Sequence, residues 1–280
     1  MAKEFKSFYK TVGGGEGEKC YYPTRLDPYG KGCYYNCKYC YAKKLLNFRK
    51  MWHPNNVSVA DIEKIRKTIR DKVPKGSTVR LGGMTDCFQP IENKTRTTYN
   101  TILELNNKGV HYLIVTKSPL VATKEYMDIL DHELAHIQVS VPTTDNKTLE
   151  ATDNAPSYNE RVTAIEKLQK EGYDVCIRLS PFLFESTDFN ELNKVKVDKC
   201  LVEFLRTTPK IAETLKNHIS FKDYTVKEGG YRHLPLEKKI QILDKLRFKE
   251  VSVCDDVATH YDYFQKNYNH NPQDCCNLRR

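Results

Sequence analysis

Three cysteines near the N-terminus have the spacing of a metal-binding loop. Cys33, Cys37 and Cys40 form a C-x3-C-x2-C pattern, and Gly30 and Gly32 allow a tight turn before them. Soft thiolates select zinc, copper(I) or iron–sulfur clusters. Structural zinc takes four protein ligands, commonly as two separated pairs, whereas this local group stops at three. A [4Fe–4S] cluster on three cysteines leaves one iron open, so the pattern favours a cluster of that kind.

Two other interpretations of these cysteines stay open. The loop could be a zinc knuckle whose fourth ligand lies elsewhere in the chain. Alternatively, Cys37 and Cys40 could form a thioredoxin-type C-x-x-C pair. Such a redox pair needs neither Cys33 nor the aromatic residues around it, so the complete pattern favours metal binding.

The rest of the chain alternates short apolar runs with segments of helical period. Strands are expected at 78–81, 110–115, 137–141, 173–179, 200–205 and 251–253, and helices at 58–72, 93–107, 124–134, 158–170, 209–218 and 235–246. Ser58, with Asp61 three residues later, is expected to cap the first helix. The alternation predicts an α/β fold with a parallel sheet and right-handed crossovers. Six or seven units suit a partial (β/α)6-type TIM barrel better than a small doubly wound sheet.

Three segments are expected along the chain. Residues 1–19, with glycines at 13–15 and 17, form a flexible N-terminal segment, and residues 20–206 form the core barrel. Residues 207–280 form a C-terminal extension that completes the barrel and covers its mouth. In a partial barrel and in a doubly wound sheet alike, ligands bind at the carboxyl ends of the strands. The residues just after the strands are therefore the site candidates.

The composition indicates a cytoplasmic chain. Its ten cysteines follow no apolar leader segment, and a chain in a reducing compartment uses cysteine for metal or redox chemistry. No apolar run approaches the ~20 residues that cross a bilayer, so no membrane partner is expected. The net charge of +9 favours polyanionic partners, although basic residues spread along the chain fit an ordinary solvated surface equally well.

The segment 30–41 resembles the signature loop of the radical S-adenosylmethionine (SAM) enzymes. The resemblance extends to the Gly-rich segment 80–86 and to the strand ends at 115–118 and 139–141, which look like those of the spore photoproduct lyase branch. It covers roughly residues 20 to 180, in the expected order. It implies that the three cysteines hold a [4Fe–4S] cluster whose open iron chelates SAM. Reductive cleavage of SAM then gives a 5′-deoxyadenosyl radical, which abstracts a hydrogen atom from a substrate.

The same resemblance implies which residues contact SAM. They are Tyr39, Gly82, Gly83, Thr85, Lys117 and Ser140. Lys117 would pair with a carboxylate, and the two glycines would let a ligand approach the backbone. An ordinary exposed lysine and a plain turn are the corresponding structural alternatives.

Candidates for hydrogen donation or substrate contact are Cys87 and Tyr41. In the photoproduct lyase branch the donor cysteine precedes the aspartate that matches Asp86, whereas here Cys87 follows it. The repair reaction itself is therefore not implied. Cys87 is equally consistent with a buried small hydrophobe, and Tyr41 with simple packing beside the cluster.

Further thiols follow the last expected strand. Cys254, Cys275 and Cys276 are candidates for a second iron–sulfur cluster, for a hydrogen donor or substrate contact, or for inert burial. Adjacent cysteines point in different directions, which argues against both Cys275 and Cys276 binding one iron site.

Charged residues near the later strands and one decoy motif complete the candidates. Arg178, Glu203 and Arg206 are expected first to form a structural ion pair and second to contact substrate. His132 and His136 satisfy the H-E-x-x-H pattern of zinc proteases, which requires both histidines on one helix. A strand is expected to begin at once after His136, so we discount that interpretation.

The resulting hypothesis is a radical SAM enzyme of the lyase or transferase type that acts on a nucleic acid or nucleotide. An electron donor such as flavodoxin or ferredoxin is the expected partner. One alternative is a radical SAM enzyme that modifies a peptide or a small metabolite. A second is a non-catalytic metal-binding or electron-carrier protein.

Overall fold

The structure is a computed structural model that describes residues 5–10, 20–53, 55–271 and 274–278. The glycine-rich stretch expected to form a flexible N-terminal loop lies outside these residues. Within the described part, no helix is long and apolar enough to cross a membrane.

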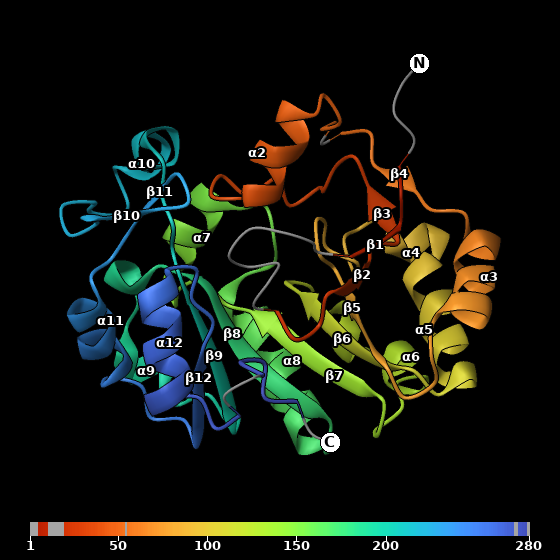
Figure 1. Ribbon diagram of the computed structural model, residues 1–280. Helices are drawn as coiled ribbons and strands as arrows, with labels where there is room; N and C mark the ends of the chain where they lie inside the picture. Colours follow the sequence, from red (N-terminus) through yellow and green to blue (C-terminus); the bar gives the residue numbers. More distant parts are fainter. Residues whose placement is uncertain (1–4, 11–19, 54, 272–273, 279–280) are drawn as a thin grey trace.

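One open sheet forms the centre of the described chain (Figure 1). Its strands, in spatial order, are β1 (Phe8–Lys10), β2 (Thr24–Leu26), β5 (Thr78–Leu81), β6 (His111–Thr116), β7 (Ala135–Ser140), β8 (Asp174–Phe182), β9 (Lys199–Phe204) and β12 (Glu250–Val253). All neighbours pair in parallel except the edge strand β1, which is antiparallel to β2. Because β1 and β12 remain edges, the sheet does not close. This confirms the predicted partial barrel.

Two short two-stranded sheets lie outside this sheet. In one, β3 (Tyr29–Gly30) pairs with β4 (Ser58–Val59), and the other is a hairpin in which β10 (Val226–Glu228) pairs with β11 (Tyr231–His233). Helix α2 (Tyr41–Phe48) and the β10–β11 hairpin lie on the same side of the sheet in Figure 1.

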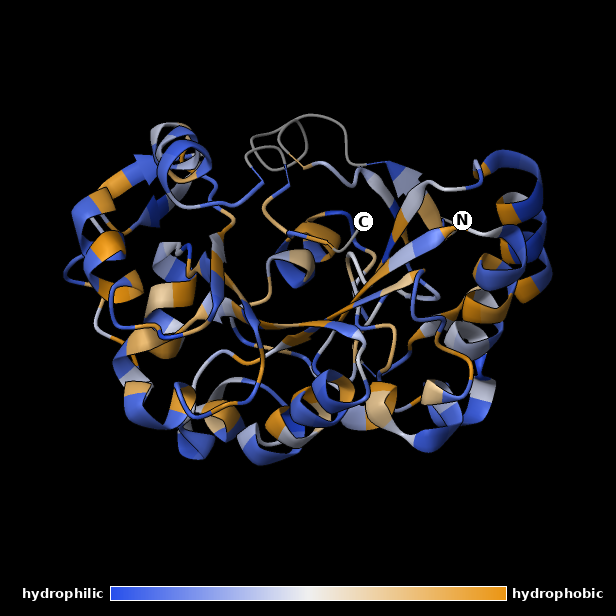
Figure 2. Cartoon of the chain, turned by 90° about the horizontal axis from the view of Figure 1, so that it is seen from below, coloured by the Kyte–Doolittle hydropathy of each residue, from blue (hydrophilic) through white to orange (hydrophobic). Residues whose placement is uncertain are grey.

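Helices cover the outer face of the sheet and turn their polar sides to solvent (Figure 2). They are α3 (Ile62–Lys72), α4 (Glu92–Thr95), α5 (Thr97–Lys108), α6 (Lys124–Met127), α7 (Asn146–Thr152), α8 (Tyr158–Lys170), α9 (Phe189–Leu192), α10 (Pro209–Leu215), α11 (Leu236–Leu243) and α12 (Ala258–Asn267), with 3-10 turns η1 (Pro119–Ala122) and η2 (Phe184–Ser186). The central strands β5 to β9 are mostly buried, as parallel strands covered on both faces are, and all six residues of β7 are buried.

The helix predicted at 124–134 is wrong over its second half. α6 ends at Met127, and the Asp131 carboxylate accepts hydrogen bonds from the N–H groups of Glu133 (2.8 Å) and Leu134 (3.0 Å), which stabilises a turn. His136 consequently lies in β7, where its Nδ1 is 2.6 Å from Asp174. The two histidines do not share a helix face, so the zinc-protease pattern is confirmed as a coincidence.

The predicted start of the first long helix also needs correction. Ser58 belongs to β4, and α3 begins at Ile62 with Asp61 as its N-cap. The Asp61 carboxylate accepts hydrogen bonds from the N–H groups of Glu63 (2.9 Å) and Lys64 (3.3 Å). A carboxylate at this position satisfies donors that the first helical turn leaves without partners.

We expect Asp61→Ala to lower the free energy of unfolding by about 1 kcal/mol, because it removes this cap. Urea denaturation measures the change. Ser58→Ala is the matched control and should change the value by less than about 0.5 kcal/mol, since Ser58 pairs with Gly30 through its backbone. Equal losses in the two variants would contradict the assignment of the cap.

Candidate active site

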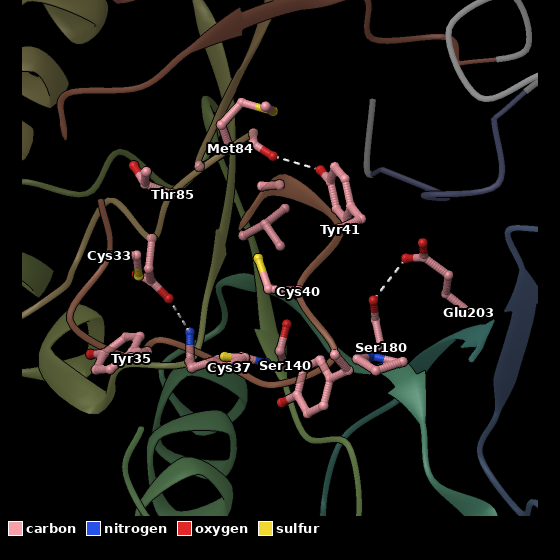
Figure 3. Close-up of a pocket in the computed structure, with 18 of the residues that line it drawn as sticks. Cys33, Tyr35, Cys37, Cys40, Tyr41, Met84, Thr85, Ser140, Ser180 and Glu203 are labelled. Carbon is pink, nitrogen blue, oxygen red and sulfur yellow. Dashed lines mark hydrogen bonds between the residues drawn. The ribbon is translucent and has the colours of Figure 1, made fainter. Parts of the chain in front are cut away.

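A pocket of about 1090 Å³ opens at the carboxyl ends of the parallel strands. Residues that end β5 to β9 form its floor, and the cysteine loop with the start of α2 forms one wall (Figure 3). The lining includes the three predicted cluster cysteines, all six predicted SAM contacts and Tyr41. Ligands of parallel α/β proteins bind at this edge, so the pocket is the candidate active site.

The three thiols of the cysteine loop face this pocket. Cys37 is buried, whereas Cys33 and Cys40 are partly exposed. Cys40 caps α2, and its sulfur accepts a hydrogen bond from the Lys43 N–H (3.4 Å). Burial raises the pKa of all three thiols, that of Cys33 to about 12. Each thiol therefore keeps its proton until a bound metal displaces it.

The turn after β5 requires glycine. Gly82 has φ +81°, and a Cβ there would stand 2.6 Å from the carbonyl oxygen of Val115. A Cβ on Gly83 would stand 2.2 Å from the Tyr9 hydroxyl. The backbone of this turn is thus packed on one side and faces the pocket on the other.

A carboxylate that the sequence patterns did not indicate holds this glycine turn. Asp27, directly after β2, accepts hydrogen bonds from the N–H groups of Gly83 (2.8 Å) and Met84 (3.0 Å) and from the Tyr9 hydroxyl (2.7 Å). Its burial raises its pKa, and these hydrogen bonds oppose the shift. The position of Asp27 directly after a strand was the one sequence signal that could have marked it as a site residue. Nothing in its neighbouring sequence indicates that it binds the glycine turn.

Thr85 and Tyr41 also fix the turn. The Thr85 hydroxyl donates to the backbone oxygen of Tyr29 (2.6 Å), and the Tyr41 hydroxyl donates to that of Gly83 (2.6 Å). Tyr41 therefore does more than pack beside the cysteines, because it connects α2 to the glycine turn (Figure 3).

A second buried network supports the opposite wall. The Lys117 Nζ lies 4.0 Å from the Asp153 carboxylate and 5.3 Å from the centre of the Tyr39 ring. Asp153 also accepts hydrogen bonds from the Tyr39 hydroxyl and from Arg161 (3.0 Å). Arg161 in turn donates to the backbone oxygen of Ser140 (3.0 Å). The Lys117 side chain is only 13% exposed, unlike an ordinary surface lysine.

Cys87 does not line the pocket. It is fully buried in the main core, and burial raises its pKa well above the ordinary value. The neighbouring Asp86 carboxylate accepts hydrogen bonds from the Thr116 hydroxyl and the Lys117 N–H, both at 2.7 Å. This placement favours the packing role for Cys87 over a substrate-facing one.

The ion pair expected near the later strands is present. Arg178 donates to Glu203 (2.6 Å), and the Ser180 hydroxyl donates to the same carboxylate (2.7 Å). Burial alone would raise the pKa of Glu203, but Arg178 and Arg206 hold it at about 2. Arg206 pairs with Asp256 instead (2.7 Å).

The cysteines near the C-terminus lie beneath the pocket, not in its lining. Cys276 is buried, and Cys254 and Cys275 pack against the same small apolar cluster. Cys254 and Cys276 both raise the pKa of the Cys275 thiol. Cys275 and Cys276 pack in one cluster although they are adjacent in the sequence.

The donor set of the pocket fits a three-thiolate iron–sulfur cluster. Among the described lining residues, the cysteines are Cys33, Cys37 and Cys40, so no fourth thiol is there to complete a zinc site. Across the described chain, no three His, Cys, Asp or Glu side chains already have metal-ligating geometry. Small rotations of these thiols must therefore accompany metal binding.

Comparison with protein families matches residues 28–192 to the Radical SAM superfamily. An uncharacterized protein of Methanocaldococcus jannaschii is 26% identical over 217 residues, which cover 69% of this chain and 80% of that protein.

Solved structures of spore photoproduct lyase are similar in fold. Its complex with dinucleoside spore photoproduct has a TM-score of 0.60 at 16% identity, covering 87% of this chain and 74% of that chain. A variant with bound SAM and the same dinucleoside also has a TM-score of 0.60 at 16% identity, covering 88% and 76%. The family model spans more than half of the sequence and includes the cysteine loop, the glycine turn and Lys117, and the chain therefore belongs to the radical SAM superfamily.

Proposed function

We propose that this enzyme holds a [4Fe–4S] cluster on Cys33, Cys37 and Cys40, binds SAM beside it, and abstracts a hydrogen atom from a nucleic acid or nucleotide. The observation that carries the proposal is the convergence of the three thiols, the glycine turn and Lys117 on one pocket. The family implies this cofactor pair, whose chemistry is the reductive cleavage of SAM to a 5′-deoxyadenosyl radical. The protein then aligns the target C–H bond and excludes water.

Each side chain has a separate task in this proposal. The backbone at Gly82 and Gly83, which lines the pocket, receives the polar end of SAM, and Lys117 pairs with its carboxylate. Tyr39 and Ser140 shape the wall behind it, since both are connected to Asp153 through hydrogen bonds or through Arg161. Thr85 and Tyr41 keep the turn in position.

The rim of the pocket supports a nucleic-acid substrate. The Arg206 guanidinium lies 5.1 Å from the ring centres of both Tyr41 and Tyr231, and the Lys44 ammonium lies 4.9 Å from that of Tyr231. Alternating cations and aromatic rings attract phosphates and stack on bases. A peptide or small metabolite is the alternative substrate, and it would need no such rim.

The reaction class and setting follow from the same proposal. A lyase or transferase reaction at the pocket needs one electron at a time, which a flavodoxin or ferredoxin would deliver. Reduced thiols and a reduced cluster also suit a cytoplasmic location.

Electron paramagnetic resonance of anaerobically reconstituted, dithionite-reduced protein tests the cofactor assignment. We expect a reduced [4Fe–4S] signal whose shape changes when SAM is added, because SAM binds the open iron. The Cys33→Ala/Cys37→Ala/Cys40→Ala variant should lack the SAM-sensitive signal. A chain that binds zinc and gives no such signal would overturn the proposal.

Gly82→Ala should abolish the SAM-induced change, because the new Cβ meets the Val115 oxygen and displaces the turn. Gly172→Ala is the matched control: Gly172 has φ +83°, but nothing lies within 4 Å of the point that its Cβ would occupy. It should cost stability by about 1 kcal/mol and leave the spectrum unchanged. Loss of the response in both variants, or in neither, would contradict the assigned role of the turn.

Oligonucleotide binding measured between 50 and 200 mM salt, roughly the range over which phosphate contacts weaken, tests the substrate class. Affinity should fall steeply with salt, and Arg206→Gln should reduce the slope of log K against log salt by about 1. Lys249→Gln is the control, because Lys249 directly precedes β12 and so lies at the amino ends of the strands, whereas the pocket lies at their carboxyl ends. If no oligonucleotide binds at low salt, the peptide or metabolite alternative replaces the nucleic acid.

A further inference from the structure

The concave interior of the sheet holds a second group of thiols, below the pocket. This interior thiol cluster consists of Cys20, Cys176, Cys254, Cys275 and Cys276. Its members come from four separate parts of the chain and pack around Leu113, Tyr22 and Leu201.

Three of these thiols, those of Cys254, Cys275 and Cys276, act on one another. Cys254 and Cys276 both raise the pKa of the Cys275 thiol, and all three residues pack in the same small cluster. Each metal–sulfur bond of a tetrahedral thiolate site is about 2.3 Å long, so these thiols would have to turn towards one another to share a metal.

Cys20 is the fourth thiol available to this group. Cys20 packs against the same small cluster as Cys254 and Cys275, and all three thiols raise the pKa of Tyr261. Cys176 is less suited, because its thiol donates to the backbone oxygen of Ile177 (3.3 Å).

Positive charge surrounds the interior thiol cluster. The Arg25 guanidinium lies 3.8 Å from the Cys20 sulfur, and Arg178 and Arg80 act on Cys276. Arg80 is 8% exposed, and its Nε has no hydrogen-bond partner among the described residues. A metal with four thiolate ligands carries net negative charge, which buried guanidinium groups would compensate. Arg178 is already paired with Glu203, so the Arg80 Nε is the buried donor that such a site would satisfy.

We infer that Cys254, Cys275 and Cys276, together with Cys20, form a second metal site that takes a thiolate-bound soft metal, either an iron–sulfur cluster or zinc. This second site adjoins the pocket that holds the first. Arg80, Arg178 and Val115 line the pocket and also border the interior thiol cluster. It goes beyond the proposed function, which uses only the three cysteines of the pocket.

The test uses the full-length Cys33→Ala/Cys37→Ala/Cys40→Ala variant, which lacks the three cluster cysteines of the pocket. After anaerobic reconstitution with iron and sulfide, or with zinc, bound metal is counted per chain. We expect about four irons with sulfide, or about one zinc, and the two arms identify the metal. Adding Cys254→Ala/Cys275→Ala should remove this metal. Adding Cys200→Ala should not, because Cys200 is buried in the main core and does not belong to the interior thiol cluster.

A second measurement needs no further variant. In the metal-loaded chain, alkylation followed by peptide mass spectrometry should show Cys254 and Cys275 protected until a chelator is added, whereas Cys200 stays protected throughout. The site is supported if the variant that lacks only the three pocket cysteines binds more metal than the variant that also carries Cys254→Ala/Cys275→Ala, and if the chelator removes the protection. Equal metal contents in these two variants, or protection that the chelator leaves unchanged, overturns it. Neither result depends on the SAM-sensitive signal of the first site.

Discussion

Three aspartates around the pocket hold its loops together. Asp27 after β2 binds the turn after β5, and Asp86 in that turn binds the end of β6. Asp153, which follows α7, accepts hydrogen bonds from Tyr39 in the cysteine loop and from Arg161 in α8. A carboxylate removed from water is unfavourable without several donors, and the loops supply those donors. Each loop therefore depends on a carboxylate from another part of the chain, so the pocket is stabilised as one unit.

Local patterns predicted much of this molecule. The strand at 78–81 and the helix at 158–170 have the predicted bounds, and the C-x3-C-x2-C spacing led to the correct family. The interactions between segments were not predictable in this way. Asp27 bonds to a backbone 56 residues away, and neither its own neighbours nor the glycine turn indicates that contact.

Cys87 and Asp61 show how single residues escape sequence patterns. Cys87 is next to a pocket residue in sequence, but the turn directs its side chain into the core. Asp61 and Ser58 are both good caps by residue type, and pairing between β3 and β4 decided between them. In both cases tertiary contacts, which no local window contains, determine the outcome.

The interior position of residues 274–278 has a consequence for biosynthesis. Asp274 accepts a hydrogen bond from Tyr22, and the backbone oxygen of Asn277 accepts one from Lys199 (2.7 Å). Segments that lie far apart in the sequence thus meet inside the curved sheet. A nascent chain cannot complete this interior until residue 278 has left the ribosome. During translation, part of the concave face of the early strands therefore stays exposed until residues 274–278 pack against it. Exposed apolar surface of this kind is what chaperones protect.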